Sequence, residues 1–155
     1  MLEIERKFLL DALPDEIDDQ PSTRILQGYL AITDDIEVRL RAREDDRLLT
    51  IKGGRGEIRH ETTLTLSAEE FDELWELTAD RRLEKRRYVM HQGDVEVEID
   101  VFEGDLAGLL IAEVEFLSAE ASAGFVPPAW FGREVTDDDT YRNAELATGG
   151  VPSGR

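Results

Sequence analysis

The sequence predicts a mainly β fold (α+β class) that forms one domain and carries a few helices. Eight segments alternate apolar and polar residues with a period of two, which is typical of strands with one buried face. Short turn-like stretches such as Asp34-Asp35 and Gln92-Gly93-Asp94 separate them and suit antiparallel hairpins. A length of 155 residues is enough for one domain with a buried core.

The expected strands follow one another along most of the chain. In order, they cover residues 2–10, 24–32, 36–43, 47–52, 57–66, 83–91, 94–102 and 110–117. The segment G-G-R-G at residues 53–56 lacks the G-K-[ST] ending of a phosphate-binding loop, so a hairpin turn is expected there. No internal repeat or linker divides the chain. The domain is expected to span residues 1–148, followed by an irregular tail over residues 149–155.

Three helices are expected outside these strands. Residues 67–70 read S-A-E-E, which has the S-x-x-E pattern of a capping box, and apolar residues then recur with helical spacing from Phe71 onward. A shorter helix is expected after Ser118. A third is expected over residues 137–146, whose first turn is rich in acids, as the helix dipole favours.

The composition excludes several kinds of site and partner. There is no cysteine, so disulfides and thiolate metal ligands are excluded, and a reducing, cytoplasmic setting is expected. No targeting pattern or stretch of roughly 20 apolar residues predicts a membrane span.

The formal net charge of −18 disfavours a broad nucleic-acid-binding surface. Salt limits that repulsion to about 8–10 Å, so a local basic pocket can still bind a small anion. The sequence leaves open whether the acidity reflects a high-salt habitat and whether the chain is a monomer or a homodimer.

The charged residues are sorted by strand and by type. Fifteen of the 18 basic residues are arginines, and the three lysines, Lys7, Lys52 and Lys85, each lie in an expected strand. Codon bias is one explanation of this pattern and a shared role is the other. Because successive side chains of a strand point to opposite faces, five strands carry one whole face of charge. These faces hold Glu3, Glu5 and Lys7; Glu37, Arg39, Arg41 and Arg43; Lys85 and Arg87; Glu96, Glu98 and Asp100; and Glu113 with Glu115.

Two arrangements of the sheet fit this sorting. In the first, an open sheet turns its charged face to water and its apolar face to the core. In the second, eight strands close into a barrel with the charges inside, where there is little spare room and where desolvation of unpaired charges is costly. The alternation alone favours the open sheet.

The charged residues are also of the two kinds that a metal-bound polyphosphate needs. Guanidinium and ammonium groups bind phosphate oxygens, and carboxylates supply the oxygen ligands that Mg²⁺ and Mn²⁺ prefer. The candidate phosphate ligands are Lys7, Arg39, Arg41, Lys52, Lys85 and Arg87, and the candidate metal ligands are Glu3, Glu5, Asp100, Glu113 and Glu115. Both sets in one cavity would form a site for a metal-bound polyphosphate.

The opening residues E-I-E-R-K, from Glu3 to Lys7, resemble the E-x-E-x-K signature of the CYTH superfamily, also called triphosphate tunnel metalloenzymes. The resemblance covers nearly the whole chain. The other matching motifs are Q-G-Y-L at residues 27–30, the R-x-R pair Arg39 and Arg41, T-I-K ending at Lys52, E-K-R-R-Y around Lys85 and Arg87, E-I-D-V-F around Asp100, A-E-V-E-F around Glu113 and Glu115, and W-F-G-R-E-V-T at residues 130–136, followed by Tyr141, Asn143 and Leu146. The last group is similar to the small stand-alone bacterial members.

The resemblance implies a closed tunnel of eight antiparallel strands, with helices packed on its outside and all three lysines inside it. It also implies hydrolysis of a short-chain triphosphate with Mg²⁺ or Mn²⁺, and inorganic tripolyphosphate giving pyrophosphate and phosphate is the expected reaction. Glu5, Lys7 and Lys85 are expected to be catalytic. Tyr29 is expected either to help the basic residues bind the substrate or to belong to the core.

Several further residues follow from the same pattern. Additional candidates for the tunnel wall are Glu37, Arg43, Arg59 and Glu61. His60 and His91 are expected to lie at the surface or to be structural, because this chemistry needs no histidine base. The chain departs from the small bacterial relatives at Thr63, where the second acid of a pair beginning at Glu61 is expected. This difference bears on metal affinity or substrate choice.

Three other functions remain as alternatives. A class IV-type adenylyl cyclase would use the same site to make cyclic AMP from ATP, and a thiamine triphosphatase would differ in what the tunnel mouth accepts. A non-catalytic sensor of polyphosphate or nucleotide would bind without hydrolysis. Fold alone does not separate them.

Overall fold

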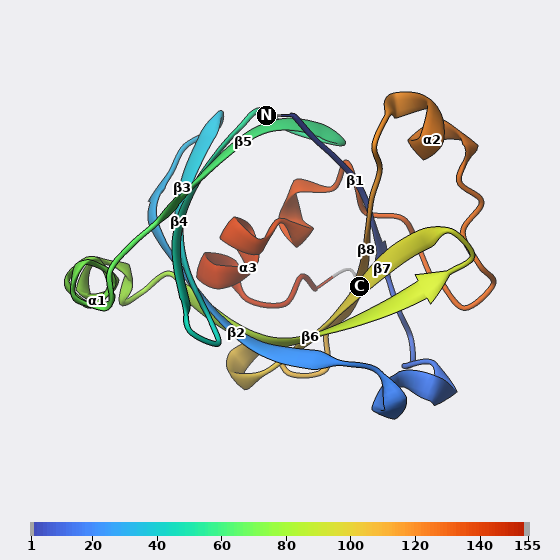
Figure 1. Ribbon diagram of the computed structural model, residues 1–155, viewed down its shortest axis with the longest axis horizontal. Helices are drawn as coiled ribbons and strands as arrows, with labels where there is room; N and C mark the ends of the chain where they lie inside the picture. The colour runs from blue at the N-terminus through green and yellow to red at the C-terminus, as the bar shows by residue number, and fades with distance from the viewer. Residues whose placement is uncertain (1, 154–155) are drawn as a thin grey trace.

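The computed structural model describes residues 2–153 and shows a closed barrel of eight antiparallel strands (Figure 1). The order around the ring is β1-β5-β4-β3-β2-β6-β7-β8, and β8 pairs with β1 to close it. The strands are β1 (Leu2–Leu9), β2 (Ser22–Ile32), β3 (Ile36–Arg43), β4 (Asp46–Gly53), β5 (Ile58–Thr65), β6 (Arg82–Gln92), β7 (Val95–Phe102) and β8 (Leu110–Glu115). All eight expected strands are present. The closed tunnel is confirmed, and the open sheet favoured by the alternation alone is wrong.

Short helices connect or follow the strands. They are the α-helices α1 (Ala68–Trp75), α2 (Ala119–Gly124) and α3 (Asn143–Gly149) and the 3-10 helices η1 (Asp15–Asp19), η2 (Glu76–Thr78), η3 (Gly104–Leu106) and η4 (Asp139–Tyr141). The capping box before α1 is confirmed, because Ser67 and Glu70 each bond the other's backbone N–H. No helix within residues 2–153 has the length and apolar character needed to cross a lipid bilayer.

The single helix expected over residues 137–146 is wrong in its extent. The side chain of Asp138 accepts hydrogen bonds from the backbone and hydroxyl of Thr140, which closes a 3-10 turn, η4, instead of an α-helix. Arg142 is then extended, with φ −65° and ψ 140°, and α3 begins only after it. The acid-rich turn was therefore correctly placed near a helix start, but it caps a separate short helix.

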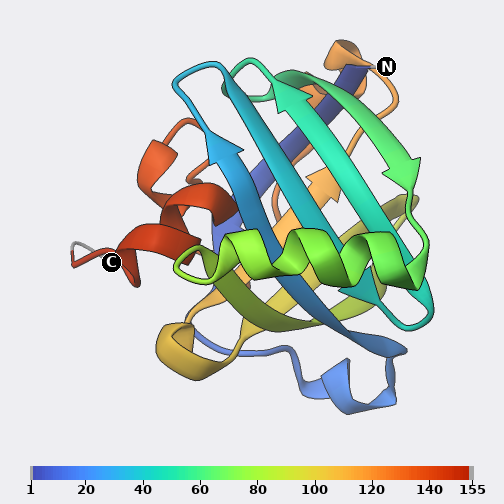
Figure 2. The ribbon, with the colours of Figure 1, turned by 90° about the vertical axis from the view of Figure 1, so that its left-hand side faces the viewer.

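The helices take two different positions on the barrel. α1 crosses the outer face of the sheet against β3 and β4, and α2 lies outside against β1 (Figures 1 and 2). α3 instead lies over one end of the barrel, where it appears inside the ring in Figure 1 and at one side in Figure 2. The expectation of helices on the outside thus describes α1 and α2, while α3 covers an opening.

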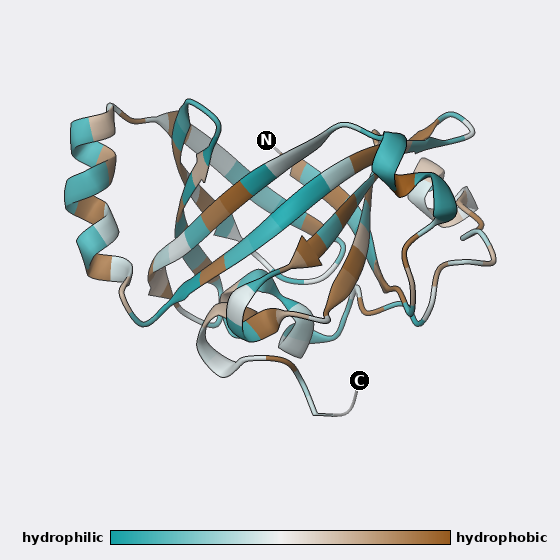
Figure 3. Cartoon of the chain, turned by 90° about the horizontal axis from the view of Figure 1, so that it is seen from below, coloured by the Kyte–Doolittle hydropathy of each residue, from teal (hydrophilic) through white to brown (hydrophobic). Residues whose placement is uncertain are grey.

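Two apolar clusters stabilise the barrel, one on its outside and one at its end. Outward-facing residues of β1, β7 and β8 form the first, together with Phe131 and neighbouring aromatic rings. In the second, Leu9 and Leu83, whose parity along their strands turns them inward, pack with Tyr141 and Leu146 from the C-terminal segment. Charged and apolar residues alternate along the strands in Figure 3. The inward face is therefore charged along most of its length and apolar at the α3 end, which closes that end.

We predict that Leu146→Ala lowers the free energy of unfolding by about 2–5 kcal/mol, since it leaves a cavity in the cluster that closes the barrel. Leu146 is 1% exposed, whereas Val126 is 83% exposed and serves as the control. Val126→Ala should change stability by less than about 0.5 kcal/mol. Urea denaturation at constant m-value measures both, and equal effects of the two substitutions would contradict the packing of α3 described here.

Candidate active site

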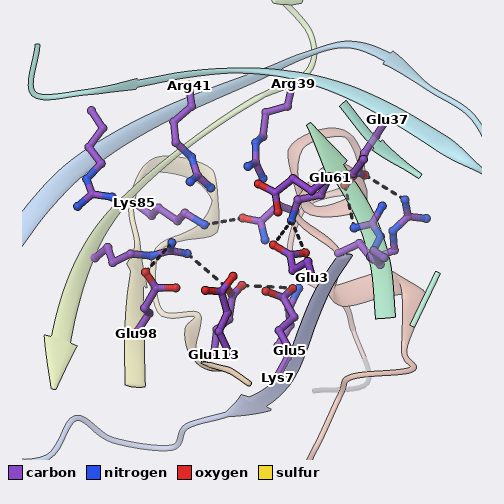
Figure 4. Close-up of a pocket in the computed structure, with 17 residues that line it drawn as sticks. Glu3, Glu5, Lys7, Glu37, Arg39, Arg41, Glu61, Lys85, Glu98 and Glu113 are labelled. Carbon is purple, nitrogen blue, oxygen red and sulfur yellow. Dashed lines mark hydrogen bonds and ion pairs between the residues drawn. The ribbon is translucent and has the colours of Figure 1, made fainter. Parts of the chain in front are cut away.

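A cavity of about 180 Å³ occupies the interior of the barrel (Figure 4). Seven of the eight strands and the start of α3 line it. The lining residues are Glu3, Glu5, Lys7, Glu37, Arg39, Arg41, Arg43, Lys52, Arg59, Glu61, Lys85, Arg87, Glu98, Glu113, Glu115, Arg142 and Asn143. Sixteen of the seventeen are charged, nine of them basic and seven acidic. Half of the 18 basic residues of the chain, including all three lysines, thus face one small space.

Three carboxylates gather on one side of this cavity. Glu3 and Glu5 extend from β1 and Glu115 from the neighbouring β8, and one oxygen atom of each lies within 4.8 Å of the others. Burial and the negative charges of Glu3, Glu98, Glu5 and other acids raise the pKa of Glu115 to about 7. Burial also raises the pKa of Glu3 and of Glu5. A cluster of acids that repel one another in this way is stabilised by a proton or by a cation.

This cluster fits a hard divalent cation. Mg²⁺ and Mn²⁺ bind carboxylate oxygens and commonly keep several water ligands, so three such groups on adjoining strands provide a suitable donor set. Lys52 contacts the same cluster, because its Nζ lies 2.9 Å from Glu3 Oε1. A phosphate oxygen close to the cation would therefore also be within reach of an ammonium group.

A second cluster of charged residues surrounds the fully buried Asp100. Arg87 donates from Nε and Nη2 to the two oxygens of Asp100 at 2.7 and 2.8 Å, and Lys85 Nζ lies 2.7 Å from Asp100 Oδ2. Burial alone would raise the pKa of Asp100, but the charges of Arg87 and Lys85 outweigh it and hold that pKa well below its usual range. Burial also lowers the pKa of Lys85 to about 7, although Asp100 opposes the change. Asp100 is therefore ionised and fully engaged by two cations.

Two of the expected metal ligands, Asp100 and Glu113, lie outside the carboxylate cluster. Asp100 neither lines the cavity nor belongs to the carboxylate cluster, so its geometry favours a role in holding Lys85 and Arg87. Glu113 lines the cavity between the two groups, 3.8 Å from Lys7 and 3.4 Å from Arg87. The pKa of Glu113 is lowered to about 2, because Arg87 and Lys7 outweigh the effect of burial.

The candidate phosphate ligands come together as expected. Lys7, Arg39, Arg41, Lys52, Lys85 and Arg87 all line the cavity. Tyr29 does not line it; this residue is fully buried, and its hydroxyl accepts a hydrogen bond from Gln27 Nε2 at 3.2 Å. The further candidates Glu37, Arg43, Arg59 and Glu61 line the cavity as well. His60 and His91 are exposed and lie outside the lining, as expected.

Sequence reasoning missed two lining residues in the C-terminal segment. Arg142 Nη2 donates to Glu37 Oε2 at 3.0 Å, and Asn143 Oδ1 accepts from Lys85 Nζ at 2.8 Å. Asn143 belongs to the matching C-terminal motif, but the irregular backbone around it gives no periodicity from which to assign a direction. At the departure from the small relatives, the hydroxyl of Thr63 lies 3.0 Å from that of Thr50, so a hydroxyl pair stands where a carboxylate was expected.

Comparisons with known proteins agree with this geometry. The CYTH domain matches residues 1–135 of the chain. The chain is 45% identical over 150 residues to an inorganic triphosphatase of Nitrosomonas europaea, covering 95% of this chain and 97% of that protein. It is 37% identical over 122 residues to an inorganic triphosphatase of Acetivibrio thermocellus, covering 77% of each. A crystal structure of an inorganic triphosphatase superposes with a TM-score of 0.72 at 41% identity, covering 97% of each chain.

We predict that Asp100→Asn lowers the free energy of unfolding at pH 7 by about 3–5 kcal/mol, because it leaves buried Lys85 and Arg87 without their shared carboxylate. The carboxyl groups of Asp100 and Glu113 have lowered pKa values, so the stability they contribute is present above pH about 4.5 and is lost as the pH falls toward about 2. The difference between wild type and variant should therefore shrink as the pH falls from 4.5. Urea denaturation from pH 7 to pH 2.5 measures it, and a difference that does not change with pH would contradict the ion-pair network.

We predict that Glu115→Gln raises the melting temperature in EDTA by about 2–4 °C, because it removes one of three mutually repelling carboxylates. The same substitution should reduce the increase in melting temperature that Mn²⁺ causes in the wild type, because a ligand has been lost. Glu73→Gln, at an exposed position of α1, is the matched control and should change neither value. If Mn²⁺ stabilised wild type and Glu115→Gln equally, the carboxylate cluster would not be the metal site.

Proposed function

The chain belongs to the CYTH domain family, and we propose that it hydrolyses inorganic tripolyphosphate to pyrophosphate and phosphate with Mg²⁺ or Mn²⁺. The observation that carries this proposal is one small cavity that joins a cluster of basic residues to a cluster of carboxylates. Either cluster alone would bind an anion or a metal ion, and the two together suit a metal-bound polyphosphate. The names of the two relatives support the same activity.

The cavity favours an inorganic chain over a nucleotide or a thiamine derivative. Its volume of about 180 Å³ lies below the 300–1,000 Å³ that is usual for sites of drug-sized ligands. No aromatic or aliphatic side chain stands among its lining residues within residues 2–153, so a nucleobase or a thiazolium ring would find no apolar wall. The apolar cluster at the α3 end also leaves no path for a bulky group to pass through the barrel.

Hydrolysis of a phosphoanhydride depends mostly on positioning and on neutralising charge. Lys7, Arg39, Arg41, Lys52, Lys85 and Arg87 are the residues that bind the phosphate oxygens in this proposal. As the bond to the terminal phosphorus breaks, negative charge moves onto the bridging oxygen of the departing pyrophosphate. Buried cations stabilise that charge more strongly than exposed ones, because water does not screen them.

The carboxylate cluster completes the site. Glu3, Glu5 and Glu115 would hold a divalent cation, which when bound neutralises phosphate charge and acidifies a water molecule. Glu113 keeps Lys7 and Arg87 directed into the cavity. A non-catalytic sensor would be expected to lack part of this cluster, and its presence argues for an enzyme. A cytoplasmic setting and a monomeric or homodimeric state stay predictions.

We predict that the wild type releases phosphate from tripolyphosphate with Mg²⁺ or Mn²⁺ at a kcat/KM at least about tenfold above that for ATP or thiamine triphosphate, since only the phosphate chain finds complementary groups. Glu5→Gln should lower kcat by at least about 100-fold, because it removes one charged ligand while preserving its shape. The exposed Glu73→Gln should keep wild-type activity.

A colorimetric phosphate assay across the three substrates, combined with chromatography of the ATP products, decides between the alternatives. Cyclic AMP as the main product from ATP would establish the cyclase instead. Tight binding of tripolyphosphate without phosphate release at saturating Mg²⁺ or Mn²⁺ would establish the sensor.

A further inference from the structure

The basic residues of the cavity differ in what holds them. Most contact a carboxylate: Lys52 lies 2.9 Å from Glu3, Arg59 3.1 Å from Glu37 and Lys85 2.7 Å from Asp100. Three arginines differ from these, since within residues 2–153 no ion pair joins Arg39, Arg41 or Arg43 to a carboxylate. Of these three, Arg41 makes two hydrogen bonds to a neutral amide, that of Gln27. The distances are 3.1 Å from Arg41 Nε and 2.7 Å from Arg41 Nη2 to Gln27 Oε1.

The amide of Gln27 is itself held in place by burial and by a further hydrogen bond. Gln27 is fully buried and stands opposite Arg41 in the β2–β3 register. Its Nε2 donates to the hydroxyl of Tyr29 at 3.2 Å. A guanidinium group only donates hydrogen bonds, so the amide oxygen must face Arg41 and the amide nitrogen must face Tyr29. Burial raises the pKa of Tyr29 to about 12, which keeps the phenol neutral. The anchor of Arg41 is therefore rigid and uncharged.

The charge of Arg41 is only partly compensated. Burial and the positive charges of Arg39 and Arg87 lower the pKa of Arg41 to about 9, although Tyr29 and Asp100 act in the opposite direction. A guanidinium whose charged form is disfavoured to this degree gains strongly from an approaching anion. A glutamate in place of Gln27 would make the same hydrogen bonds, but it would satisfy that charge permanently.

Arg41 and the carboxylate cluster lie on opposite sides of the cavity. In the ring order, β2 and β3 lie directly across the barrel from β8 and β1. Figure 4 shows Arg41 on the opposite side of the cavity from Glu5 and Glu113. An elongated anion held at the carboxylate cluster by one end would therefore extend across the cavity toward Arg41.

We propose that Gln27 is a positioning residue that holds Arg41 by two hydrogen bonds while leaving the positive charge of Arg41 available to a phosphate group of the substrate. This inference rests on the proposed function for the identity of the anion. It explains why a half-buried cation in a strongly acidic chain is held by an amide rather than by a carboxylate.

Gln27→Glu separates this role from a purely structural one. The new carboxylate would accept both bonds from Arg41 and a bond from the Tyr29 hydroxyl, so the melting temperature should stay the same or rise. The dissociation constant for tripolyphosphate should rise about 10- to 100-fold, because a charge-assisted contact with the phosphate is lost. KM should rise in parallel, with a smaller change in kcat. A merely structural glutamine cannot give weaker binding together with unchanged or higher stability.

The dissociation constant is measured by isothermal titration calorimetry with tripolyphosphate in EDTA, where binding does not depend on turnover. Gln92→Glu, which adds the same charge at an exposed position of the β6–β7 hairpin, is the matched control and should bind within about twofold of wild type. Wild-type affinity in Gln27→Glu, or a joint loss of affinity and stability, would overturn the inference. A wild type that binds tripolyphosphate but releases no phosphate would overturn the proposed hydrolysis and leave this comparison intact.

Gln27→Met provides a second, independent test. It nearly preserves the length of the side chain but removes the acceptor, so tripolyphosphate should bind about 3- to 10-fold more weakly. The same substitution in an Arg41→Met background should cause no further loss, because the two residues act through one contact. Equal losses in both backgrounds would show that Gln27 does not act through Arg41.

Discussion

The burial of charge inside a closed barrel is the constraint on which the rest of this structure depends. A charged group removed from water is strongly destabilised unless it is paired, and the interior of an eight-stranded barrel offers little room for water. The chain meets this constraint by alternating cations and carboxylates between adjoining strands, as Arg87 and Asp100 do across β6 and β7. The candidate site includes two regions where this pairing is incomplete: the cluster around Glu5, which has excess negative charge, and the surroundings of Arg39 and Arg41, which have excess positive charge.

The amino-acid sequence predicted the strands and the face of each side chain, but not what those faces meet. A period of two is the same for an open sheet and for a barrel, so closure followed only from the resemblance and from the pairing of β8 with β1. The same limit applies to the surroundings of Asp100. Along its strand Asp100 has the same parity as Glu98, which lines the cavity, but the register places it opposite Arg87 and within reach of Lys85, and these contacts favour a supporting role over that of a metal ligand.

Residues outside the regular strands were the ones that sequence reasoning missed. Arg142 and Asn143 reach the cavity from a segment that changes from a 3-10 helix to extended backbone to an α-helix within a few residues, so it has no single period. Gln27 was part of a recognised motif, but a neutral side chain carries no electrostatic signal. Its importance appears only when the β2–β3 register sets it against Arg41.

The difference in charge between the whole chain and its cavity also affects which anions reach the site. The chain as a whole carries a formal charge of −18, yet its cavity holds nine basic residues against seven acidic ones. Beyond about 8–10 Å salt screens the surface charge, so a small anion at the mouth is attracted mainly by the groups inside. A long polyanion such as nucleic acid would have to lie along the acidic exterior while one end entered, and repulsion would act over its whole length. A strongly acidic exterior around a slightly basic cavity therefore disfavours long polyanions and is compatible with the short polyphosphate of the proposed function.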